Sequence, residues 1–421
     1  MPRRARTFGV LIGFVALSLV PAMAGAEEAE GHLSLSALIA EALAHNPTLQ
    51  SYRYRSRAAR ETIRQEASLP DPQLTVTEWE VPSNFNLATP GQRWFGLGQT
   101  FPFPGKRRTR SDVAEKAAAA VDDSYHTKEL DVRAEVTTTF YVLFRIDRLI
   151  LLHREHERLL ESFVRIALER YRVGQAPQQD SLKAQVEMSQ LHGGLVLLEE
   201  ERAVAVANLN RLVGRPIENP VAEIAPVVYL PVNVDLDALS ASARERRPDL
   251  IEAGHQLERS DRAVELARLE ARPDFSVELT YVDVRDGANE WMAVARMNLP
   301  WIFGGKYAAR QQQARAERAA AESEQRATRE RAMMEVRNAY TRFRNAEHLY
   351  SIYTTGIVPQ AEQNVDAARI AYQTGRTSFL DLIDAERRLR DIQMEAVMHL
   401  AVYWQQAAEL ERTSGVNLTL P

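Results

Sequence analysis

The chain has 421 residues, of which 45% are hydrophobic and 26% are charged, a composition typical of a large folded protein rather than a disordered one. Its formal net charge of −5 argues against nucleic acid as a partner. The absence of cysteine excludes a disulfide framework, a thiolate metal site and a lipid attached to an N-terminal cysteine.

The first 26 residues, 1–26, have the pattern of a secretory signal peptide. Three arginines precede an apolar run from Phe8 to Val20, and small residues allow cleavage after Ala24 or Ala26. Removing this segment deletes three basic residues and no acids, which lowers the net charge to −8. No later stretch approaches the roughly 20 apolar residues of a transmembrane helix, so only β-strands could hold the mature chain in a membrane.

Two helices and a β-hairpin are predicted next. The helices cover residues 33–44 and 48–68 and are separated at Asn46-Pro47, because proline disfavours helix in the residue before it. Two segments rich in Thr, Val, Trp and Phe follow, at 73–81 and 92–101, and together they predict a hairpin over 73–101.

A very long helical hairpin completes this first unit, 33–214. From Arg107 to Arg170 there is no proline or glycine, and at 1.5 Å per residue this run would make a helix on the order of 95 Å long. A turn near 173–177 sends a second helix back toward residue 214. Four prolines within residues 215–234 then mark a linker.

Residues 235–415 repeat the same order of predicted helices and strands 201 positions later. A second strand hairpin is predicted over 274–299 and a second tight turn near 374–378, with a kink where Gly356 and Pro359 interrupt the long helix. The chain is therefore predicted to be an internal duplication. The tip pairs that share the offset are Tyr171 and Tyr372, Gly174 and Gly375, and Asp180 and Asp381.

The strands of the second hairpin alternate between apolar and polar residues, as strands of a membrane barrel do. Trp79, Trp94 and Trp291 could anchor such a barrel at the membrane interface or pack within the sheet. Four strands cannot close a barrel, and an open edge in lipid would leave backbone groups unpaired. Other chains must supply the missing strands, and a trimer contributing 12 is the economical solution for a wide conduit.

Two stretches and the paired proline motifs carry a family resemblance: GLGQTFPFPGKRR at 96–108 and IVPQAEQNVDAARIAYQTGRTSFLDLIDAERRL at 357–389. The mature chain resembles the outer-membrane factor, or TolC-like, family of tripartite efflux channels, most closely its heavy-metal (CzcC/CusC-type) branch. The resemblance implies a mainly α fold with a β-barrel contribution, in which a homotrimer forms a 12-stranded barrel in outer-membrane lipid, continued by a periplasmic α-helical barrel.

The same resemblance implies the partners and the function. The tip would meet a periplasmic adaptor (membrane-fusion) protein and an inner-membrane pump of the resistance-nodulation-division type, and the trimer would conduct metal cations passively. Drug efflux and type I secretion remain alternative roles for a channel. The alternative from another class of protein is a soluble periplasmic adaptor or scaffold. Such a protein would share the long helical hairpin but lack lipid-facing strands.

By the same resemblance, aspartates that match Asp381 and Asp384 constrict the periplasmic aperture. A three-fold axis would bring six carboxylates around one opening, which favours cations. The competing interpretation is that Asp384 only pairs with Arg387 or Arg388 on its own helix, which contributes little.

The family's tip also carries a tyrosine and an arginine that latch the closed state. Tyr372 matches the tyrosine, but the arginine stands at Arg376, directly after Gly375, and Thr377 occupies the matching place. The offset puts Lys183 where Asp384 stands in the second unit. Our hypothesis is that Lys183 pairs with Asp384 or Asp381 of a neighbouring tip.

No enzyme or cofactor site is predicted. The sequence shows no cluster of nucleophile, base and orienting residue and no glycine-rich phosphate loop. His153 and His156 lie on one helix face, but no third metal ligand accompanies them. We expect both to be solvated surface residues.

Overall fold

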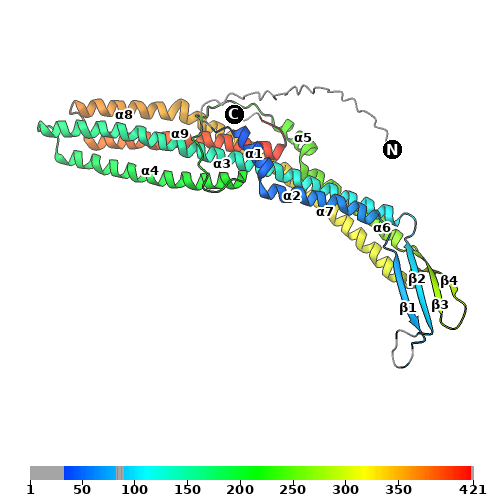
Figure 1. Ribbon diagram of the computed structural model, residues 1–421. Helices are drawn as coiled ribbons and strands as arrows, with labels where there is room; N and C mark the ends of the chain where they lie inside the picture. Colours follow the sequence, from blue (N-terminus) through cyan, green and yellow to red (C-terminus); the bar gives the residue numbers. More distant parts are fainter. Residues whose placement is uncertain (1–32, 82, 84–86, 88–89, 419–421) are drawn as a thin grey trace, which may run out of the picture.

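A computed structural model of the chain describes residues 33–418 apart from 82, 84–86 and 88–89, so the predicted signal peptide lies outside the described residues. The described chain is mostly helical and contains a four-stranded antiparallel sheet. The molecule is elongated, with the sheet at one end and the two turns that join the longest helices at the other (Figure 1).

The first unit follows its predicted bounds to within two residues in each strand and in the first three helices. Its long helix α3 has 67 residues, which corresponds to about 100 Å at 1.5 Å per residue. The elements are α1 (Leu35–His45), α2 (Pro47–Ala67), β1 (Gln73–Trp79), β2 (Gln92–Phe101), α3 (Lys106–Arg172) and α4 (Gln178–Val213).

The second unit repeats this order with two additions. A 3₁₀ turn, η1 (Pro300–Phe303), follows the sheet, and a π-helical turn, η2 (Tyr353–Ile357), lies where the kink was predicted. Pro359 has no N–H to donate, and a wider turn is one way a helix accommodates the loss. The remaining elements are α5 (Leu236–Arg246), α6 (Pro248–Glu270), β3 (Phe275–Val284), β4 (Glu290–Met297), α7 (Gly304–Ile352), α8 (Val358–Gln373) and α9 (Phe379–Ser414).

The duplication is visible in the packing as well as in the sequence. Asn46 donates a hydrogen bond from Nδ2 to the carbonyl of Leu212 at 2.8 Å. At the same position of the second unit, the Arg247 guanidinium reaches the carbonyl of Thr413 at 3.4 Å. Both pairs are related by the 201-residue offset, so each X-Pro junction is fastened to the last turn of its own returning helix.

The sheet has one apolar and one polar face. Its order is β1-β2-β3-β4, and the register places Leu97 opposite both Leu74 and Leu279 on one face. On the other face, a Cβ at Gly96 would lie 2.7 Å from the Glu278 carboxylate, so glycine makes room there for the polar side chains of β3. Among the described strands, β1 and β4 each have a neighbour on one side only.

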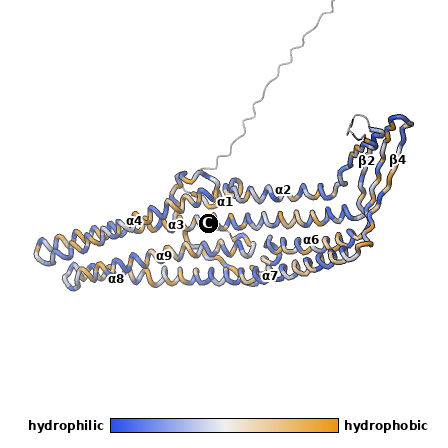
Figure 2. Tube along the Cα trace, turned by 90° about the horizontal axis from the view of Figure 1, so that it is seen from below, coloured by the Kyte–Doolittle hydropathy of each residue, from blue (hydrophilic) through white to orange (hydrophobic). Residues whose placement is uncertain are grey.

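The helices run side by side from the sheet to the tips (Figure 2). Near the sheet, α3 lies between α2 and α6, with α7 beyond α6; toward the tips it lies between α4 and α9, with α8 beyond α9. Two separate hydrophobic clusters hold this layer together. One surrounds Trp404 and Tyr141 at the middle of the molecule, and the other surrounds Phe163 and Tyr372 near the tips.

An irregular segment, residues 215–234, crosses the middle of this layer on one face. The carboxylate of Asp147 in α3 accepts hydrogen bonds from Arg202 Nε at 2.6 Å and from the Ile224 backbone N–H at 3.1 Å. Val221 and Ile224 are buried in the central cluster. The segment is therefore bound to the helices by apolar packing and by a half-buried ion pair.

Candidate functional site at the helical tips

The two tips are the α3–α4 tip (residues 173–177) and the α8–α9 tip (residues 374–378), and they share one backbone geometry. Gly174 and Gly375 have φ values of 73° and 74°, in the left-handed region that favours glycine at the end of a helix. Each glycine donates its N–H to the carbonyl of the tyrosine three residues earlier, at 3.0 Å in both tips. The difference between the tips therefore lies in their side chains.

The two tips differ in the residue that directly precedes the returning helix. In the α8–α9 tip this residue is Ser378, and it forms a reciprocal capping box with Asp381. The Asp381 carboxylate accepts hydrogen bonds from Thr377 Oγ1 at 2.6 Å, Ser378 Oγ at 2.7 Å and Ser378 N at 3.1 Å. These bonds, that from Thr377 most of all, lower the pKa of Asp381. Pro177 holds the equivalent place in the other tip, and it has neither a hydroxyl nor an N–H.

Without such a box, Asp180 contacts the other tip. The Tyr372 hydroxyl donates to Asp180 Oδ2 at 3.3 Å, and the Tyr372 side chain is only 2% exposed. Burial, and next the charge of Asp180, raise the pKa of Tyr372 to about 12, so the phenol keeps its proton at neutral pH. This hydrogen bond joins the end of α8 to the start of α4.

Arg170 is the basic residue that contacts Tyr372, and the sequence did not reveal it. Its guanidinium lies 4.7 Å from the centre of the Tyr372 ring and donates to the Tyr372 carbonyl. The equivalent position in the second unit is Ala371, so comparison of the two units did not single out Arg170. Arg376 and Tyr171, which the sequence did suggest, are both exposed.

Asp384 lies on the exposed side of α9. Its carboxylate is 58% exposed and 3.5 Å from Arg387 Nη1, which is the pairing within one helix that competes with an aperture role. Arg387 also bonds, through Nε at 2.8 Å, to the buried carboxylate of Glu187 in α4. Lys183 makes no ion pair with Asp384 or Asp381 within the described part of the chain.

The prediction that His153 and His156 are solvated was wrong. Their exposed fractions are 6% and 4%. Gly194 allows the burial of His153, because a Cβ there would lie 3.1 Å from His153 Nε2. The His156 ring is 2.8 Å from Glu386 Oε1 and 2.8 Å from Gln393 Oε1. Both partners are more than 200 positions away in the chain, so periodicity around the histidines could not show them.

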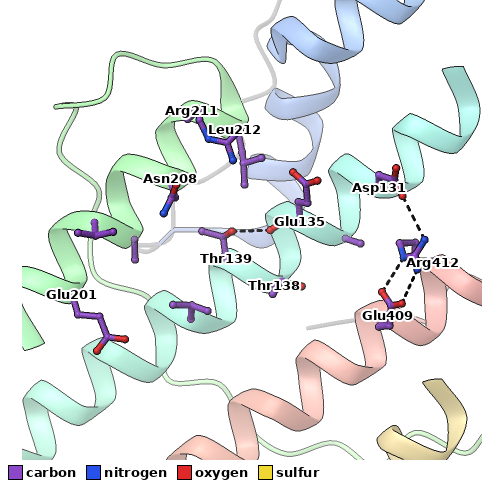
Figure 3. Close-up of a pocket in the computed structure, with 14 residues that line it drawn as sticks. Asp131, Glu135, Thr138, Thr139, Glu201, Asn208, Arg211, Leu212, Glu409 and Arg412 are labelled. Carbon is purple, nitrogen blue, oxygen red and sulfur yellow. Dashed lines mark hydrogen bonds and ion pairs between the residues drawn. The ribbon is translucent and has the colours of Figure 1, made fainter. Parts of the chain in front are cut away.

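A groove of about 790 Å³ lies between α3, α4 and α9 (Figure 3). Three of its charges are paired with one another: Arg412 lies 2.7 Å from Glu409 and 3.5 Å from Asp131. Thr138 of α3 lines the groove. Asp147, which binds the irregular segment, lies two and a half helical turns further along α3. The groove and the irregular segment therefore lie on opposite faces of α3. Among the described residues, no three His, Asp or Glu side chains converge as metal ligands would.

Comparison with known proteins identifies the family. The family described as "Outer membrane efflux protein" matches residues 38–215 and again residues 239–416. The chain belongs to the outer membrane efflux protein family. The second match begins 201 positions after the first, which is the offset that relates the two tips.

Solved structures of two other proteins share this fold. The structures of CusC, described as undergoing transmembrane channel formation, give a TM-score of 0.79 at 19% identity, covering 91% of this chain and 92% of theirs. The outer membrane protein VceC of Vibrio cholerae gives 0.76 at 20% identity, with 91% and 96% covered. In sequence, the chain is 24% identical to the cobalt-zinc-cadmium resistance protein CzcC of Cupriavidus metallidurans, over 97% of this chain and 96% of CzcC.

Proposed function

We propose that three copies of this efflux protein form the passive exit duct of a tripartite efflux system, set in the outer membrane and extending into the periplasm. The observation that carries the proposal is the separation of two ends: a sheet with one apolar face at one end, and paired helical tips at the other. None of the helices in the described ranges is long and apolar enough to cross a membrane.

The exposed apolar residues of the sheet support its placement in lipid. Phe101, Phe275 and Met297 form one row across the strands nearest the helices, and each is 42–46% exposed. Beyond this row, η1 exposes three consecutive apolar residues, Trp301, Ile302 and Phe303, by 60–73%. At the far end of the strands, Trp291 is 68% exposed and lies 5.2 Å from Tyr281. Aromatic residues at both limits of an apolar band are typical of a membrane-spanning barrel.

The two tryptophans on the opposite face differ from Trp291. Trp79 and Trp94 stack on each other, with ring centres 5.7 Å apart. This stacking supports the second of the two roles expected from the sequence, packing within the sheet. Trp291 is the tryptophan of the three that we assign to the membrane interface.

Trimer formation would cover the edges that a single chain leaves open. Three sheets joined edge to edge would give 12 strands and satisfy the backbone groups of β1 and β4. Along α4, at one edge of the helical layer, five apolar side chains lie within one arc of the helix and are 53–66% exposed. They are Leu182, Val186, Val196, Leu197 and Val204. We propose that α8 of the next copy covers this stripe.

The irregular segment and the groove then take opposite sides of the conduit. The segment, α1 and α5 add bulk to one face of the helical layer, and a conduit has no room for that bulk inside. The proposal therefore places residues 215–234 on the outside and the groove lined by Glu135, Thr138 and Glu201 on the inside. The carboxylates and hydroxyls of these three residues would then face the solutes that pass.

At the tips, the proposal gives different roles to the two predicted aperture residues. Asp384 has an exposed carboxylate that is not part of a cap, and it would face the opening, where three copies would gather negative charge. Asp381 is occupied by its capping box and would shape the turn. Contacts of Tyr372 with Asp180 and Arg170 would hold the entrance closed, and Lys183 would pair with Asp384 or Asp381 of the neighbouring copy.

Metal cations are the substrate that the comparisons favour. CzcC is named for resistance to cobalt, zinc and cadmium. Membership of the family supports the proposed periplasmic adaptor and resistance-nodulation-division pump. Drug efflux or type I secretion is the alternative, since fold similarity to VceC, at a TM-score of 0.76, gives no basis for choosing between substrates.

Two experiments test the proposal. Outer-membrane fractions should contain a trimer whose migration in gels changes on heating, whereas an adaptor or scaffold would appear in the soluble periplasmic fraction. A deletion strain should then be compared with its complemented parent on divalent metals, monovalent metals and hydrophobic drugs. Sensitivity to drugs alone would replace the metal assignment, and recovery of a soluble monomer would reject the channel.

A further inference from the structure

A charged cavity lies where the sheet joins the helices. This junction cavity has a volume of about 730 Å³ and is lined by the N-terminal parts of α3 and α7, the end of α6, and the residues that precede β3 and follow β4. Basic side chains outnumber acidic ones in its lining, so positive charge is in excess. The basic residues are Lys106, Arg110, Lys306 and Arg310, and the acidic residues are Glu270 and Asp274.

The two acidic side chains of the cavity are paired within the chain. Asp274 Oδ1 accepts hydrogen bonds from the Phe103 N–H at 2.7 Å and from Lys106 Nζ at 2.8 Å. Glu270 Oε2 lies 3.4 Å from Arg310 Nε. Each acid therefore has one basic partner, and two basic side chains remain.

The two remaining basic side chains are Arg110 and Lys306. Neither makes a hydrogen bond or an ion pair within the described part of the chain, although Lys306 Nζ lies 5.6 Å from the centre of the Tyr307 ring. Both α3 and α7 begin here without an acidic residue in the first turn and without a side-chain cap. Because the N-terminus of a helix carries partial positive charge, basic residues at these positions have an electrostatic cost that a bound anion would remove.

Two further hydrogen-bond donors of the cavity lack acceptors. The Lys106 side chain is buried, and its ammonium group carries three N–H bonds. Two of them donate to the Arg272 carbonyl at 2.7 Å and to Asp274, and the third has no acceptor among the described residues. Asn298 Oδ1 accepts from the Asp274 N–H at 2.5 Å, which fixes the orientation of the amide. Its Nδ2 atom has no acceptor within the same part of the chain.

The cavity belongs to the polar side of the sheet. Ser276 and Arg296 are paired on that face. Asp274 and Asn298 lie two positions further along the same strands, where side chains return to the same face. The Asn298 N–H donates to the Asp274 carbonyl at 3.3 Å, which continues the pairing of the two strands. In the proposed duct the polar face lines the conduit, so the cavity would be reached from inside, where the helical part meets the barrel.

We propose that the junction cavity of each chain binds a phosphate-type oxyanion on the conduit side of the sheet. Such an anion offers several charged acceptor oxygens. The guanidinium of Arg110, the ammonium groups of Lys106 and Lys306 and the amide of Asn298 supply matching donors. Its location inside a conduit rests on the proposed function, whereas the binding itself does not. Bound anions in three copies would cancel the excess positive charge and remove a barrier to cations that enter the barrel.

Calorimetric titration of the purified protein in detergent with inorganic phosphate tests the binding. We expect saturable binding of one phosphate per chain. Arg110→Gln and Lys306→Gln should each weaken this binding about tenfold. Because neither side chain has an ion-pair or hydrogen-bond partner in the described chain, both variants should fold like the wild type.

Arg108→Gln is the matched control for this titration. Arg108 is exposed, does not line the cavity, and lies two residues from Arg110 on the opposite face of α3. Its loss should leave the affinity for phosphate unchanged. Equal weakening in Arg108→Gln and Arg110→Gln, or the absence of saturable binding to the wild type, overturns the inference.

A second titration separates the two sources of phosphate, which are free anions and lipid headgroups. Lipid chains would lie against the opposite, apolar face of the sheet, so the position of the cavity favours a free anion. Soluble dihexanoyl phosphatidylglycerol should therefore bind more weakly than inorganic phosphate. Tighter binding of this lipid would overturn the assignment to a free anion and place a headgroup in the cavity.

Reversal potentials in planar bilayers test the effect on conduction. Under a potassium chloride gradient at constant ionic strength, inorganic phosphate in both chambers should shift the wild-type reversal potential toward greater cation preference. The shift should be lost in Arg110→Gln and retained in Arg108→Gln. A conducting protein that binds phosphate without this shift overturns the location inside the conduit. A protein that binds phosphate through these residues but never conducts would reject the exit duct and leave the anion site in place.

Discussion

Asp180 and Asp381 stand at equivalent positions 201 residues apart, yet their carboxylates bond to different partners. Asp381 accepts three hydrogen bonds from Thr377 and Ser378 of its own turn. Asp180 follows Pro177, which can donate none, and accepts instead from Tyr372 in the other tip. The capping residue therefore accounts for the difference. After Ser378 the aspartate bonds within its own turn, and after Pro177 it bonds to the other turn.

Removing the hydroxyl of Tyr372 should weaken the closed state. Tyr372→Phe keeps the ring that contacts Arg170 at 4.7 Å and Phe379 at 5.3 Å and deletes only the bond to Asp180. We expect a loss of about 1 kcal/mol and a higher closed-state conductance. Tyr171→Phe is the matched control, since Tyr171 is 44% exposed and should change neither quantity. Equal effects of the two substitutions would contradict the assignment.

Much of the fold could be predicted because proline, glycine and hydrophobic periodicity act locally. Proline at 47 and 248 begins a helix in each unit, and glycine at 174 and 375 ends one. The capping box was also readable, because Ser378 and Asp381 have its spacing. Asp381 was nevertheless interpreted only as an aperture residue.

The remaining contacts depend on segments that are distant in the chain. Arg170 reaches Tyr372 across the two units, and its repeat equivalent is an alanine. His156 is buried by partners 230 and 237 positions away, and His153 by the close approach that Gly194 permits. Neither local propensity nor the duplication contains this information, since both describe one unit at a time.

The two aspartates of the α8–α9 tip should respond differently to neutralisation. Asp384→Asn removes an exposed charge from the proposed opening and should reduce the preference for cations over anions several-fold, measured as a shift in reversal potential under a salt gradient. Asp381→Asn should alter the stability of the turn more than its selectivity, because its carboxylate is directed to its own cap. A larger selectivity change in Asp381→Asn would reverse these roles.

The pH dependence of the capping box has a definite sign. Hydrogen bonds from Thr377 and Ser378 lower the pKa of Asp381. The ionised box therefore stabilises the tip above the pKa of the unfolded chain and loses that contribution as the pH falls through the lower, folded value. Asp381→Asn, which cannot ionise, should remove this acid sensitivity from the unfolding curve. An unchanged curve below about pH 4 would show that the box adds nothing.

Charge reversal at Lys183 tests whether neighbouring tips pair. Lys183→Glu should repel Asp384 or Asp381 of the next copy and raise closed-state conductance in planar bilayers. Gln185→Glu is a suitable control, since it adds a negative charge two residues further along α4 at an exposed position. Unchanged closed-state conductance in Lys183→Glu would reject the pairing.

Glu411 should make the protein less stable as the pH rises from about 4.5 toward neutrality. Burial raises the pKa of this carboxyl to about 7, although the Leu418 N–H, which donates to Glu411 Oε1 at 2.7 Å, acts in the opposite direction. Because the folded value exceeds that of the unfolded chain, ionisation costs free energy that grows above about pH 4.5 and is complete above pH 7. Glu411→Gln keeps an oxygen for Leu418 and removes the charge, so it should stabilise the protein by up to about 3 kcal/mol at pH 8 and by little near pH 4.5.

Glu409→Gln is the control, because Glu409 is paired with Arg412 at 2.7 Å, and its loss should destabilise the protein at pH 8. Melting curves of the three proteins at both pH values decide the matter, and a Glu411→Gln variant that is no more stable than the wild type at pH 8 would show that this carboxyl is not held in a costly ionised form.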